Sequence, residues 1–405
     1  MPRRTARTRI IKIITAAGLS GLLIAAAAVA LPAANAAQAP AIPQPGSGSQ
    51  LRAVTCTSAS NCWAVGDYGN GPVDASEALH WDGSAWTLVS TPNPAGAPNG
   101  HDILYGVTCV SATDCWAVGE SGEGIIQHRT LALHWNGTSW SQVATPNPGG
   151  PPGAWFLAGV SCTAASNCWA VGHHARPHGD NVNMALHWNG TSWSWAATPE
   201  PDKSIGGHAR QLSAIRCVSK SDCWAVGFWG SGEPRNLAGP EAFRWTGTKW
   251  SRVSTPKVGD YNGVACTGRA NCWAVFSDGS AHWNGTRWSQ VPTPHSASKF
   301  NTLLGVTCAR ATECWAAGIL NASGADGSGE LTDMLRWSGT KWTRVATPNP
   351  GGSTESDDNS AVNELDGVAC GSPTSCWSVG SYWDYTAQTR LSIALHWNGS
   401  SWATG

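Results

Sequence analysis

Short apolar runs separated by clusters of glycine, asparagine and proline recur along almost the whole chain. In one stretch they are LYGVTC (104–109), CWAVG (115–119), LALHW (131–135) and WSQVA (140–144). Runs of this length that are rich in Val, Leu, Trp and Thr and bounded by turn residues are typical of β-strands. No useful length of the chain has the 3.6-residue apolar period of a helix. The pattern therefore predicts an all-β protein.

Turn signals join the four runs into a group. Asn136-Gly137 stands between the third and fourth runs, and Asn-Gly is the strongest short-range signal for a β-hairpin. The Thr-Pro-Asn-Pro segment after the fourth run ends strand pairing, because proline has no N–H to donate. Each group of four runs therefore predicts a four-stranded antiparallel sheet.

The four-run group occurs seven times. Every copy carries Cys-x5-Cys-Trp over its first two runs and Trp-x-Gly-x-x-Trp over its last two, and successive first cysteines are 53, 53, 55, 49, 42 and 62 residues apart. A four-stranded unit with this period predicts a seven-bladed β-propeller, because blades packed around a ring bury the faces that one sheet alone leaves exposed. The alternative is an open solenoid, which needs distinct capping repeats at both ends.

The two ends of the chain complement each other. The last copy stops at Gly405 without the Thr-Pro-Asn-Pro segment, and residues 41–46 align with residues 144–149 of the second copy. We predict a propeller over residues 51–405, preceded by an N-terminal segment (37–50) whose first part lies along the outer edge of the seventh blade and closes the ring.

Residues 1–36 have the pattern of a signal peptide. A basic segment that ends at Lys12 precedes an apolar stretch, and Ala34-Asn35-Ala36 supplies small residues for cleavage. A retained membrane anchor and twin-arginine export are the alternatives. No later segment is apolar enough to span a membrane. The sequence thus predicts a secreted, extracellular bacterial protein that has no membrane association after cleavage.

Composition narrows the function classes. Only 13% of the residues are charged, and the net charge of −1 becomes −6 once the five basic residues of the leader are removed, with 20 basic and 26 acidic residues left. Nucleic-acid binding through a basic surface is therefore not expected. The 25 tryptophans also exclude a disordered chain.

All fourteen cysteines belong to the seven Cys-x5-Cys motifs. In an exported protein such pairs predict disulfides, each worth about 2–2.5 kcal/mol by the chain-entropy estimate. Zinc thiolates are the alternative, but zinc needs four ligands and each pair sits on a different blade. The predicted pairs are Cys56/Cys62, Cys109/Cys115, Cys162/Cys168, Cys217/Cys223, Cys266/Cys272, Cys308/Cys314 and Cys370/Cys376.

Two other repeated features admit a functional and a structural interpretation. A histidine precedes the third-run tryptophan in five copies and an arginine in two, and because arginine is not a metal ligand we expect hydrogen-bonding roles. Four Asn-Gly-Thr/Ser turns also match the glycosylation sequon, and we interpret them as turns. The residues concerned are His80, His134, His187, His282, His396, Arg244 and Arg336, and Asn136, Asn189, Asn284 and Asn398.

The loops predict two unlike faces. Successive loops of an antiparallel blade alternate between faces, so the Cys-x5-Cys and Asn-Gly loops share one face, which we call the constant face. The loops between the second and third strands and the connections between repeats share the other, the variable face, and differ in every copy. Function usually resides in varied loops on a rigid scaffold, so we expect a ligand site on the variable face.

Four tryptophans lie outside the repeat pattern: Trp155, Trp195, Trp229 and Trp383. Trp155, Trp229 and Trp383 fall in variable segments, where an indole can stack on a sugar, and Tyr385 follows the last of them. These four aromatic residues, including the tyrosine, are the candidate ligand-binding set. Trp195 is not part of it.

Polar clusters on the variable face give weaker candidates. His173, His174, His178 and Asp180 lie in one loop, but their spacing matches no defined metal site. An acidic run can bind Ca²⁺ or a sugar or can be simply solvated: Glu355, Asp357, Asp358, Glu364 and Asp366. We predict no metal and no cofactor.

On these repeats the chain resembles the β-propeller superfamily that includes kelch-like, galactose-oxidase-like and Asp-box, sialidase-like repeats, and it looks like the secreted propellers of actinobacteria. The resemblance covers residues 37–405. Trp135–Trp140 keeps the Gly-x-x-Trp of an Asp-box but lacks its upstream Ser and its Asp. Neither the arginine triad with a Tyr/Glu pair of sialidases nor the copper site of galactose oxidase can be assigned, so the resemblance implies no catalytic residues.

We therefore expect a monomeric, non-enzymatic binding or scaffold protein whose partner is a glycan, a cell-wall polymer or an extracellular protein. The alternative is a secreted carbohydrate-active hydrolase or lyase with its site in the propeller funnel. Glycoside hydrolysis needs two carboxylates at a defined separation. The candidates on the variable face are Asp102, Glu120, Asp180, Glu233, Asp260 and Asp384.

Overall fold

The computed structural model describes eleven stretches of the chain. They are residues 42–70, 73–96, 100–123, 127–147, 154–175, 181–199, 208–231, 238–294, 301–321, 329–352 and 362–405. The predicted signal peptide lies outside them. No helix in these stretches is long and apolar enough to cross a membrane.

The described residues form four strands in each repeat, and each strand pairs antiparallel with the next one. Repeats 1 to 4 contain β1 (Ser47–Ser58), β2 (Asn61–Asn70), β3 (Val73–Trp81), β4 (Trp86–Leu88), β5 (Gly100–Ser111), β6 (Asp114–Glu123), β7 (Gln127–Trp135), β8 (Trp140–Gln142), β9 (Trp155–Ala164), β10 (Asn167–Ala175), β11 (Asn181–Trp188), β12 (Trp193–Ala196), β13 (His208–Ser219), β14 (Asp222–Ser231), β15 (Ala238–Trp245) and β16 (Trp250–Val253).

Repeats 5 to 7 follow the same order. They contain β17 (Tyr261–Gly268), β18 (Asn271–Phe276), β19 (Gly279–Trp283), β20 (Trp288–Val291), β21 (Asn301–Arg310), β22 (Glu313–Asn321), β23 (Glu330–Trp337), β24 (Trp342–Arg344), β25 (Asn363–Ser372), β26 (Ser375–Asp384), β27 (Thr389–Trp397) and β28 (Trp402–Thr404).

The prediction of an all-β fold built from repeated four-stranded antiparallel sheets is confirmed. Repeats 3 to 7 each form a sheet of four strands. Repeats 1 and 2 belong to one eight-stranded sheet, because Asp74 of β3 pairs in parallel with His101 of β5. That single residue pair is the only strand pairing between the two four-stranded halves among the described residues.

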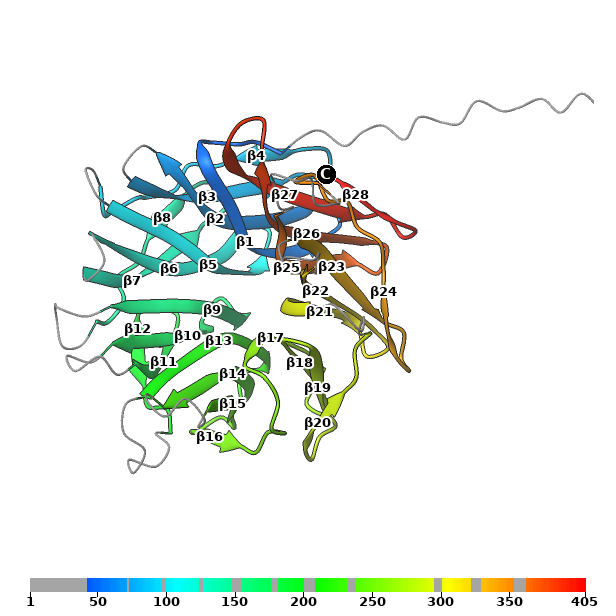
Figure 1. Ribbon diagram of the computed structural model, residues 1–405. Coiled ribbons are helices and arrows are strands. Elements are labelled where there is room, and N and C mark those ends of the chain that lie inside the picture. Colours follow the sequence, from blue (N-terminus) through cyan, green and yellow to red (C-terminus); the bar gives the residue numbers. More distant parts are fainter. Residues whose placement is uncertain are drawn as a thin grey trace, which may run out of the picture. The chain divides into compact units, whose positions relative to one another are not determined.

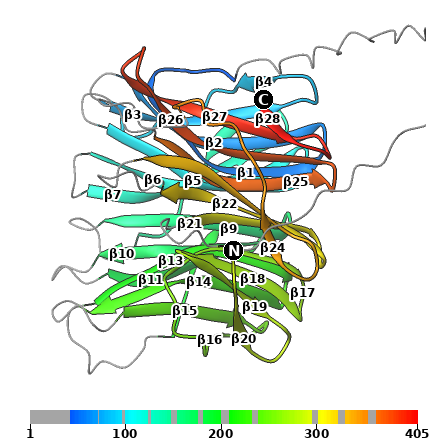
Figure 2. The same ribbon diagram turned by 45° about the vertical axis from the view of Figure 1, so that its right-hand side comes forward.

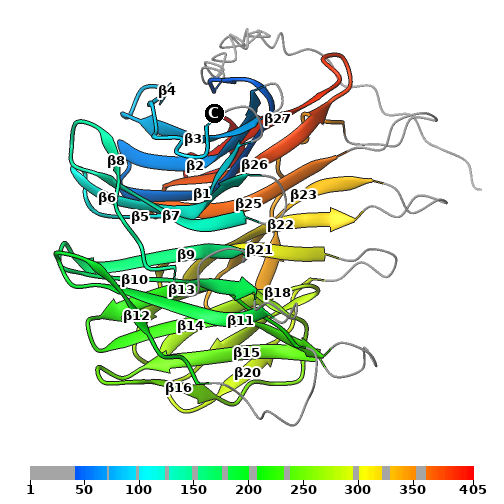
Figure 3. The ribbon, with the colours of Figure 1, turned by 90° about the vertical axis from the view of Figure 1, so that its left-hand side faces the viewer.

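The first strands of the repeats lie side by side in a cyclic order. β1 contacts β5, the contacts continue through β9, β13, β17 and β21 to β25, and β25 contacts β1. Figure 1 shows these strands towards the middle and the fourth strands, such as β16 and β24, at the outside. The turned views keep β1 next to β25 (Figures 2 and 3).

A small residue stands where neighbouring first strands come closest. A methyl group added to Gly106 would lie 3.0 Å from the Cα of Gly159, and one added to Gly367 would lie 3.1 Å from the Cα of Ala53. The position is the third before the first cysteine in every repeat and holds Ala53, Gly106, Gly159, Ala214, Gly263, Gly305 and Gly367. Larger side chains there would force the inner strands apart.

Three tryptophans from two neighbouring repeats meet at each interface between repeats. The ring centroid of Trp63 lies 4.8 Å from that of Trp135 and 5.0 Å from that of Trp140 in the next repeat. Trp377 of the last repeat packs in the same way against Trp81 and Trp86 of the first, so the clusters form a cycle that joins both ends of the described chain. The other five are Trp116/Trp188/Trp193, Trp169/Trp245/Trp250, Trp224/Trp283/Trp288, Trp273/Trp337/Trp342 and Trp315/Trp397/Trp402.

The predicted disulfides are confirmed in all seven repeats, where each joins paired residues of the first and second strands. The bonds are Cys56–Cys62, Cys109–Cys115, Cys162–Cys168, Cys217–Cys223, Cys266–Cys272, Cys308–Cys314 and Cys370–Cys376. Every cysteine of the chain is thereby oxidised, and none is a free thiol. The alternative of zinc thiolates is therefore wrong, because a sulfur atom in a disulfide is not a thiolate.

The second cysteine of each motif is buried in the core. At most 1% of its surface is exposed, because it begins the second strand in the core between repeats. A ligand cannot reach these side chains, so they are structural residues of the core and belong to no binding site. They are Cys62, Cys115, Cys168, Cys223, Cys272, Cys314 and Cys376.

The Asn-Gly turns form uniform loops at the same face as the disulfides. Gly137 has a φ of 96°, and Asn136 Oδ1 accepts hydrogen bonds from the backbone N–H groups of Thr138 and Ser139 at 2.9 and 3.1 Å. Glycine tolerates this backbone conformation, and the asparagine side chain closes the loop. The repeated asparagine thus has a structural role in the turn.

The residue before each third-strand tryptophan reaches the residue before the second cysteine. Nε2 of His80 lies 2.7 Å from Oδ1 of Asn61, and the two arginines reach acidic partners, which confirms the expected hydrogen-bonding role. The seven pairs are His80–Asn61, His134–Asp114, His187–Asn167, Arg244–Asp222, His282–Asn271, Arg336–Glu313 and His396–Ser375.

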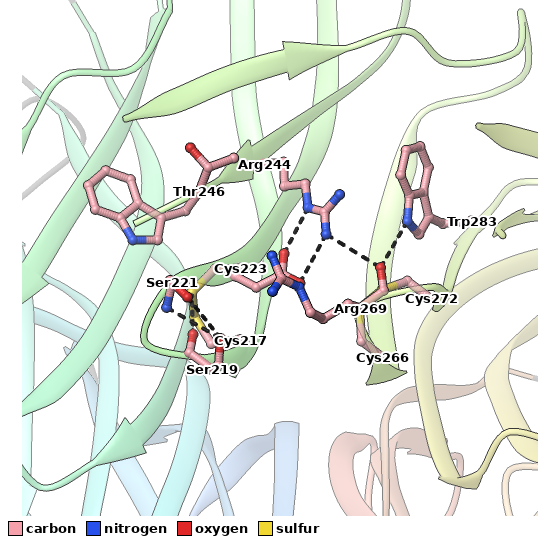
Figure 4. A network of polar contacts seen from close by, with 12 residues as sticks. Cys217, Ser219, Ser221, Cys223, Arg244, Thr246, Cys266, Arg269, Cys272 and Trp283 are labelled. Atoms are coloured by element: carbon pink, nitrogen blue, oxygen red, sulfur yellow. Dashed lines mark hydrogen bonds and ion pairs between the residues drawn. A yellow bond between two sulfur atoms is a disulfide. The ribbon is translucent and has the colours of Figure 1, made fainter. Parts of the chain in front are cut away.

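One of these pairs extends into the next repeat (Figure 4). Arg244 donates two hydrogen bonds to the fully buried Asp222, at 2.8 and 3.0 Å. Nε of Arg269, in repeat 5, lies 3.2 Å from the same carboxylate, and Trp283 Nε1 donates to the carbonyl oxygen of Arg269 at 3.1 Å. The constant face therefore links repeats by polar contacts as well as by tryptophans.

Candidate functional sites on the variable face

A pocket of about 750 Å³ opens beside Trp229. Trp229 lies near the end of β14, and the residue paired with it on β15 is Gly239. A methyl group at Gly239 would lie 3.6 Å from Trp229 Nε1, in ordinary contact, so the indole lies beside the neighbouring strand. The indole is half-buried and lines the pocket.

The opposite wall of this pocket is the segment that follows β16. Thr255 Oγ1 donates to the carbonyl oxygen of Pro240 at 3.2 Å, which ties the segment to β15. Arg252 and Lys257 are the charged residues of the described lining, and no carboxylate belongs to it. The pocket combines an aromatic ring, prolines, hydroxyl groups and two cations, as a site for a polar ligand with a flat apolar face requires.

Trp155 is less available to a ligand than the sequence suggested. β9 begins at this residue, so its side chain packs into the core between repeats 2 and 3, with 4% of its surface exposed. His174 stacks on it at a ring distance of 4.2 Å. Trp195, which the sequence set aside, is 39% exposed and packs edge-on to both rings.

Trp383 and Tyr385 lie at the tip of the hairpin between β26 and β27. Their rings are 6.4 Å apart and edge-on, and both side chains are partly exposed. Asp384 Oδ1 accepts hydrogen bonds from the N–H groups of Thr386 and Ala387 at 2.8 and 3.0 Å. The carboxylate thus closes the turn beside the two partly exposed rings.

The histidines of the third repeat take part in ring stacks. His173 lies 4.7 Å from Phe156, and burial, then the charge of His174, lower its pKa to about 4. His178 and Asp180 lie outside the described residues. Among the residues that are described, no group of three or more His, Cys, Asp or Glu side chains could hold a metal ion.

The structure describes four of the six carboxylates proposed for a hydrolase, and these four are spread over three repeats. Asp102 and Glu120 belong to repeat 2, Asp260 to repeat 5 and Asp384 to repeat 7, whereas Asp180 and Glu233 lie outside the described residues. Burial raises the pKa of Asp102, Glu120 and Asp260. Nothing in their placement brings Asp260 to the other two.

Glu120 has two polar partners in its own repeat. The hydroxyl group of Tyr105 donates to one carboxylate oxygen at 2.7 Å, and Nδ1 of His128 lies 2.6 Å from the other. The side chain of Glu120 is only 3% exposed. A buried carboxyl group with a phenol and an imidazole in contact is the most chemically equipped of the predicted acids.

A cluster that sequence reasoning missed joins repeats 7, 1 and 2, and we call it the mouth cluster. Its members are Gln50, Arg52, Asp67, Tyr105, Glu364, Asp366 and Arg390. The contacts are Arg52 Nε to Asp67 Oδ1 at 2.6 Å, Gln50 Nε2 to Asp366 Oδ2 at 3.1 Å, Arg390 Nη1 to Gln50 Oε1 at 2.8 Å and the Arg52 guanidinium over the Tyr105 ring at 5.1 Å. Burial and the neighbouring Glu364 raise the pKa of Asp366 well above its ordinary value.

One variable position in the otherwise uniform first strand indicated this cluster in the sequence. The position four residues before the first cysteine adjoins the ring of small residues, yet it holds a different side chain in each copy. The seven residues are Arg52, Tyr105, Ala158, Ser213, Asn262, Leu304 and Asp366. Variation at one position of an otherwise uniform strand indicates a place that packing does not dictate.

No family model and no curated protein matches the sequence. Solved structures do match. A GH74 xyloglucanase from Xanthomonas campestris has a TM-score of 0.53 and 11% identity over 88% of this chain and 59% of that chain. A protein of unknown function from Dyadobacter fermentans has a TM-score of 0.51 and 9% identity over 87% and 96%. YCF48 bound to a D1 peptide has a TM-score of 0.44 and 14% identity over 74% and 81%.

These likenesses show the fold alone. The xyloglucanase is a β-propeller protein, so the repeated four-stranded sheets of this chain belong to a β-propeller. This chain spans less than two thirds of the length of the xyloglucanase. Nothing about ligand or activity follows from the match.

Proposed function

We propose that the chain is an exported seven-bladed β-propeller that binds a glycan in the Trp229 pocket. The observation that carries the binding proposal is the pocket itself, in which a half-buried indole, Arg252 and Lys257 face one cavity of about 750 Å³.

Seven blades are supported by the cyclic contacts. The eight-stranded sheet divides into two blades at its single parallel residue pair, and the tryptophan clusters run through seven repeats and back to the first. An open solenoid would leave its first and last repeats apart, whereas β1 contacts β25.

The N-terminal segment supports ring closure. Gln44 Nε2 donates to the carbonyl oxygen of Ser392, and the N–H of Ser392 donates to Gln44 Oε1, both at 2.9 Å. Thr130 and Asn147 of repeat 2 have the equivalent backbone contact at 3.0 Å. Deletion of residues 37–46 should lower the melting temperature markedly, and an unchanged melting curve would contradict closure by this segment.

Export is supported by the signal-peptide pattern of residues 1–36 and by seven disulfides, which persist in oxidising compartments. Mass measurement of protein recovered outside expressing bacteria tests it. A first residue of Ala37 is expected, and retention of the leader would contradict cleavage there.

A glycan fits the pocket better than a purely apolar ligand does. The apolar face of a pyranose ring packs on an indole, and its hydroxyl groups need hydrogen-bond donors and acceptors. Ser254 and Thr255 supply hydroxyl groups in the lining. Arg252 and Lys257, with no carboxylate in the described lining, favour a glycan that carries uronate or phosphate groups.

Binding to a panel of neutral and acidic polysaccharides tests the proposal. Trp229→Ala should abolish binding and Arg252→Gln should weaken it selectively for acidic members, while the melting temperature changes little. Trp195→Ala is the matched control, because it removes an exposed tryptophan outside this pocket. Equal binding by wild type and Trp229→Ala, or no binding across the panel, would reject the pocket as a glycan site.

Hydrolysis of a glycan is the second candidate, and the mouth cluster favours it. Glu364 and Asp366 interact closely enough for one to raise the pKa of the other, and Arg52 lies in the same network. Release of new reducing ends that disappears in Asp366→Asn and persists in Trp229→Ala would establish an enzyme at the mouth cluster. Binding without any such release supports the first candidate.

A further inference from the structure

The first strands enclose a second cavity, on the axis of the cyclic arrangement. Its volume is about 230 Å³, and residues of all seven repeats line it. They are the two residues before the first cysteine of each repeat and, in repeats 1, 5, 6 and 7, that cysteine as well. The cavity therefore lies towards the constant face, away from the mouth cluster. We call it the axial cavity. It is separate from the pocket at Trp229, whose described lining shares no residue with it.

One side chain sets the charge of this cavity. The position before the first cysteine holds a hydroxyl group in four repeats (Thr55, Thr108, Ser161 and Thr307) and an alanine in two (Ala265 and Ala369). In repeat 4 it holds Arg216, which is the charged residue of the described lining. The uniform strand therefore changes from a small or hydroxyl side chain to a guanidinium at one point of the ring.

Arg216 has no carboxylate to pair with. The side chain is open to the space of the cavity, and it makes no hydrogen bond or ion pair with the residues that the structure describes, unlike Arg244 and Arg336 at the outer strands. The side chain is exposed to solvent in this space, and the nearby walls lower the pKa of Arg216 through desolvation, although a guanidinium remains protonated at neutral pH. A cation that lines a small cavity and has no partner among the described residues favours an anion.

The walls add hydrogen-bond donors. The cavity-lining residues of each first strand pair only with the second strand of the same repeat, so the other edge of the first strand turns backbone N–H and C=O groups towards the axis. Threonine and serine hydroxyl groups stand on the same ring. Guanidinium, hydroxyl and backbone N–H groups around a small space are the groups that bind oxyanions.

We infer that the axial cavity is an anion-binding site in which Arg216 holds a small oxyanion. The volume admits inorganic phosphate or sulfate, or the carboxylate end of a longer ligand. The shared chemistry is two or more negatively polarised oxygens that accept from the planar guanidinium fork. This site is independent of the glycan proposal, because its residues belong to other strands and to the opposite end of the repeats.

Calorimetric titration of the whole protein with phosphate, sulfate and acetate, at fixed ionic strength in chloride, tests the site. Wild type should bind at least one of them at one site per chain. Arg216→Gln should weaken binding by about tenfold or more, the value of a lost charged hydrogen bond. Arg216→Lys keeps the charge and should retain part of the affinity.

The control variant is Arg252→Gln, which removes a cation from the glycan pocket and should leave titration unchanged. Thr108→Val keeps the arginine and should weaken anion binding less than Arg216→Gln does. The site can therefore be tested even if Arg216→Gln folds poorly. Acetate binding alone would assign the carboxylate end of a ligand, and phosphate or sulfate binding would assign a free oxyanion. Absence of binding by all three, or equal affinity in Arg216→Gln, would overturn the inference.

Discussion

The same strands form both faces of the repeats, but the residues are uniform at the constant face and differ from repeat to repeat at the variable face. At the constant face every repeat places a disulfide, a tryptophan cluster and a His/Arg contact at the same positions. At the variable face equivalent positions diverge: the residue six after the second cysteine is a tyrosine in repeat 1, a histidine in repeat 3 and Trp229 in repeat 4.

The difference teaches where stability and specificity reside. Contacts that are repeated seven times hold each repeat together or join it to the next, so their loss should destabilise the fold without touching a ligand. Residues that occur in only one repeat do not make these stabilising contacts. The Trp229 pocket and the mouth cluster consist of such residues. Substitutions at the two faces should therefore separate stability from binding.

The largest loss of stability is expected from a substitution in a tryptophan cluster. Trp224 is fully buried between repeats 4 and 5, and Trp224→Ala should lower the free energy of unfolding by about 3–5 kcal/mol through lost burial and a cavity. Denaturant unfolding measures it. Trp195→Ala, at an exposed tryptophan, is the control, and a similar small loss in both variants would mean that the clusters do not hold the repeats together.

Substitution of the buried Glu77 should give the next largest change in the free energy of unfolding, and at high pH this change should be a gain in stability. Burial, then the nearby Asp67, raise the pKa of Glu77 from 4.5 to about 8. The folded protein therefore holds this proton more tightly than the unfolded chain, so stability falls as pH rises from about 4.5 to about 8 and then levels off.

Glu77→Gln should remove that fall. At pH 9 the variant should be more stable than wild type by several kcal/mol, since the pKa rises from 4.5 to about 8 and each pKa unit corresponds to about 1.4 kcal/mol, while at pH 4.5 the two should be close. Unfolding free energies at three pH values measure it, with the exposed Glu123→Gln as control. Parallel pH curves for Glu77→Gln and wild type would show that Glu77 is not held protonated.

Removal of one disulfide should cost somewhat less. Cys109→Ala with Cys115→Ala opens one seven-residue loop in repeat 2, for which chain entropy predicts a loss of about 2–2.5 kcal/mol. The same pair of changes in repeat 6, at Cys308 and Cys314, should cost about the same, because the two loops are equal in length. A large loss in one repeat and none in the other would show that the constant face is not uniform in energy.

The smallest change in stability is expected when one of the seven polar pairs of the constant face is exchanged for another. Asp222→Asn leaves Arg244 and Arg269 without their shared carboxylate and should destabilise the protein. Adding Arg244→His recreates the His–Asn pair of repeats 1, 3 and 5, and should recover about 1 kcal/mol of that loss. A double variant no more stable than Asp222→Asn would mean that Arg244 acts through its tryptophan contacts instead.

The fold could be predicted largely because the chain aligns with itself. Seven copies of Cys-x5-Cys-Trp fix which residues pair, and the disulfides and strands follow locally from each copy. Trp229 could be singled out for the converse reason, since it departs from the pattern, and it lines a pocket.

The mouth cluster could not be found in this way. Gln50 and Asp366 are 316 residues apart in the chain and touch only because the last repeat lies beside the first. The prediction for Trp155 failed for a related reason. The sequence placed this residue in the connection between repeats, but β9 begins at Trp155, and the strand buries its ring. Contacts between repeats, and the points where strands begin, depend on packing that no single copy encodes.

The cycle of tryptophan clusters has a consequence for how the protein comes apart. In a linear array a terminal repeat is held by one interface and can fray alone. Here Trp377 joins the last repeat to the first, so every repeat is held on two sides and none is terminal. Detaching any one of them breaks two interfaces at once, which makes partial opening costly and unfolding all-or-none. Hydrogen exchange of the inner strands should then report one common opening energy rather than a gradient from the ends.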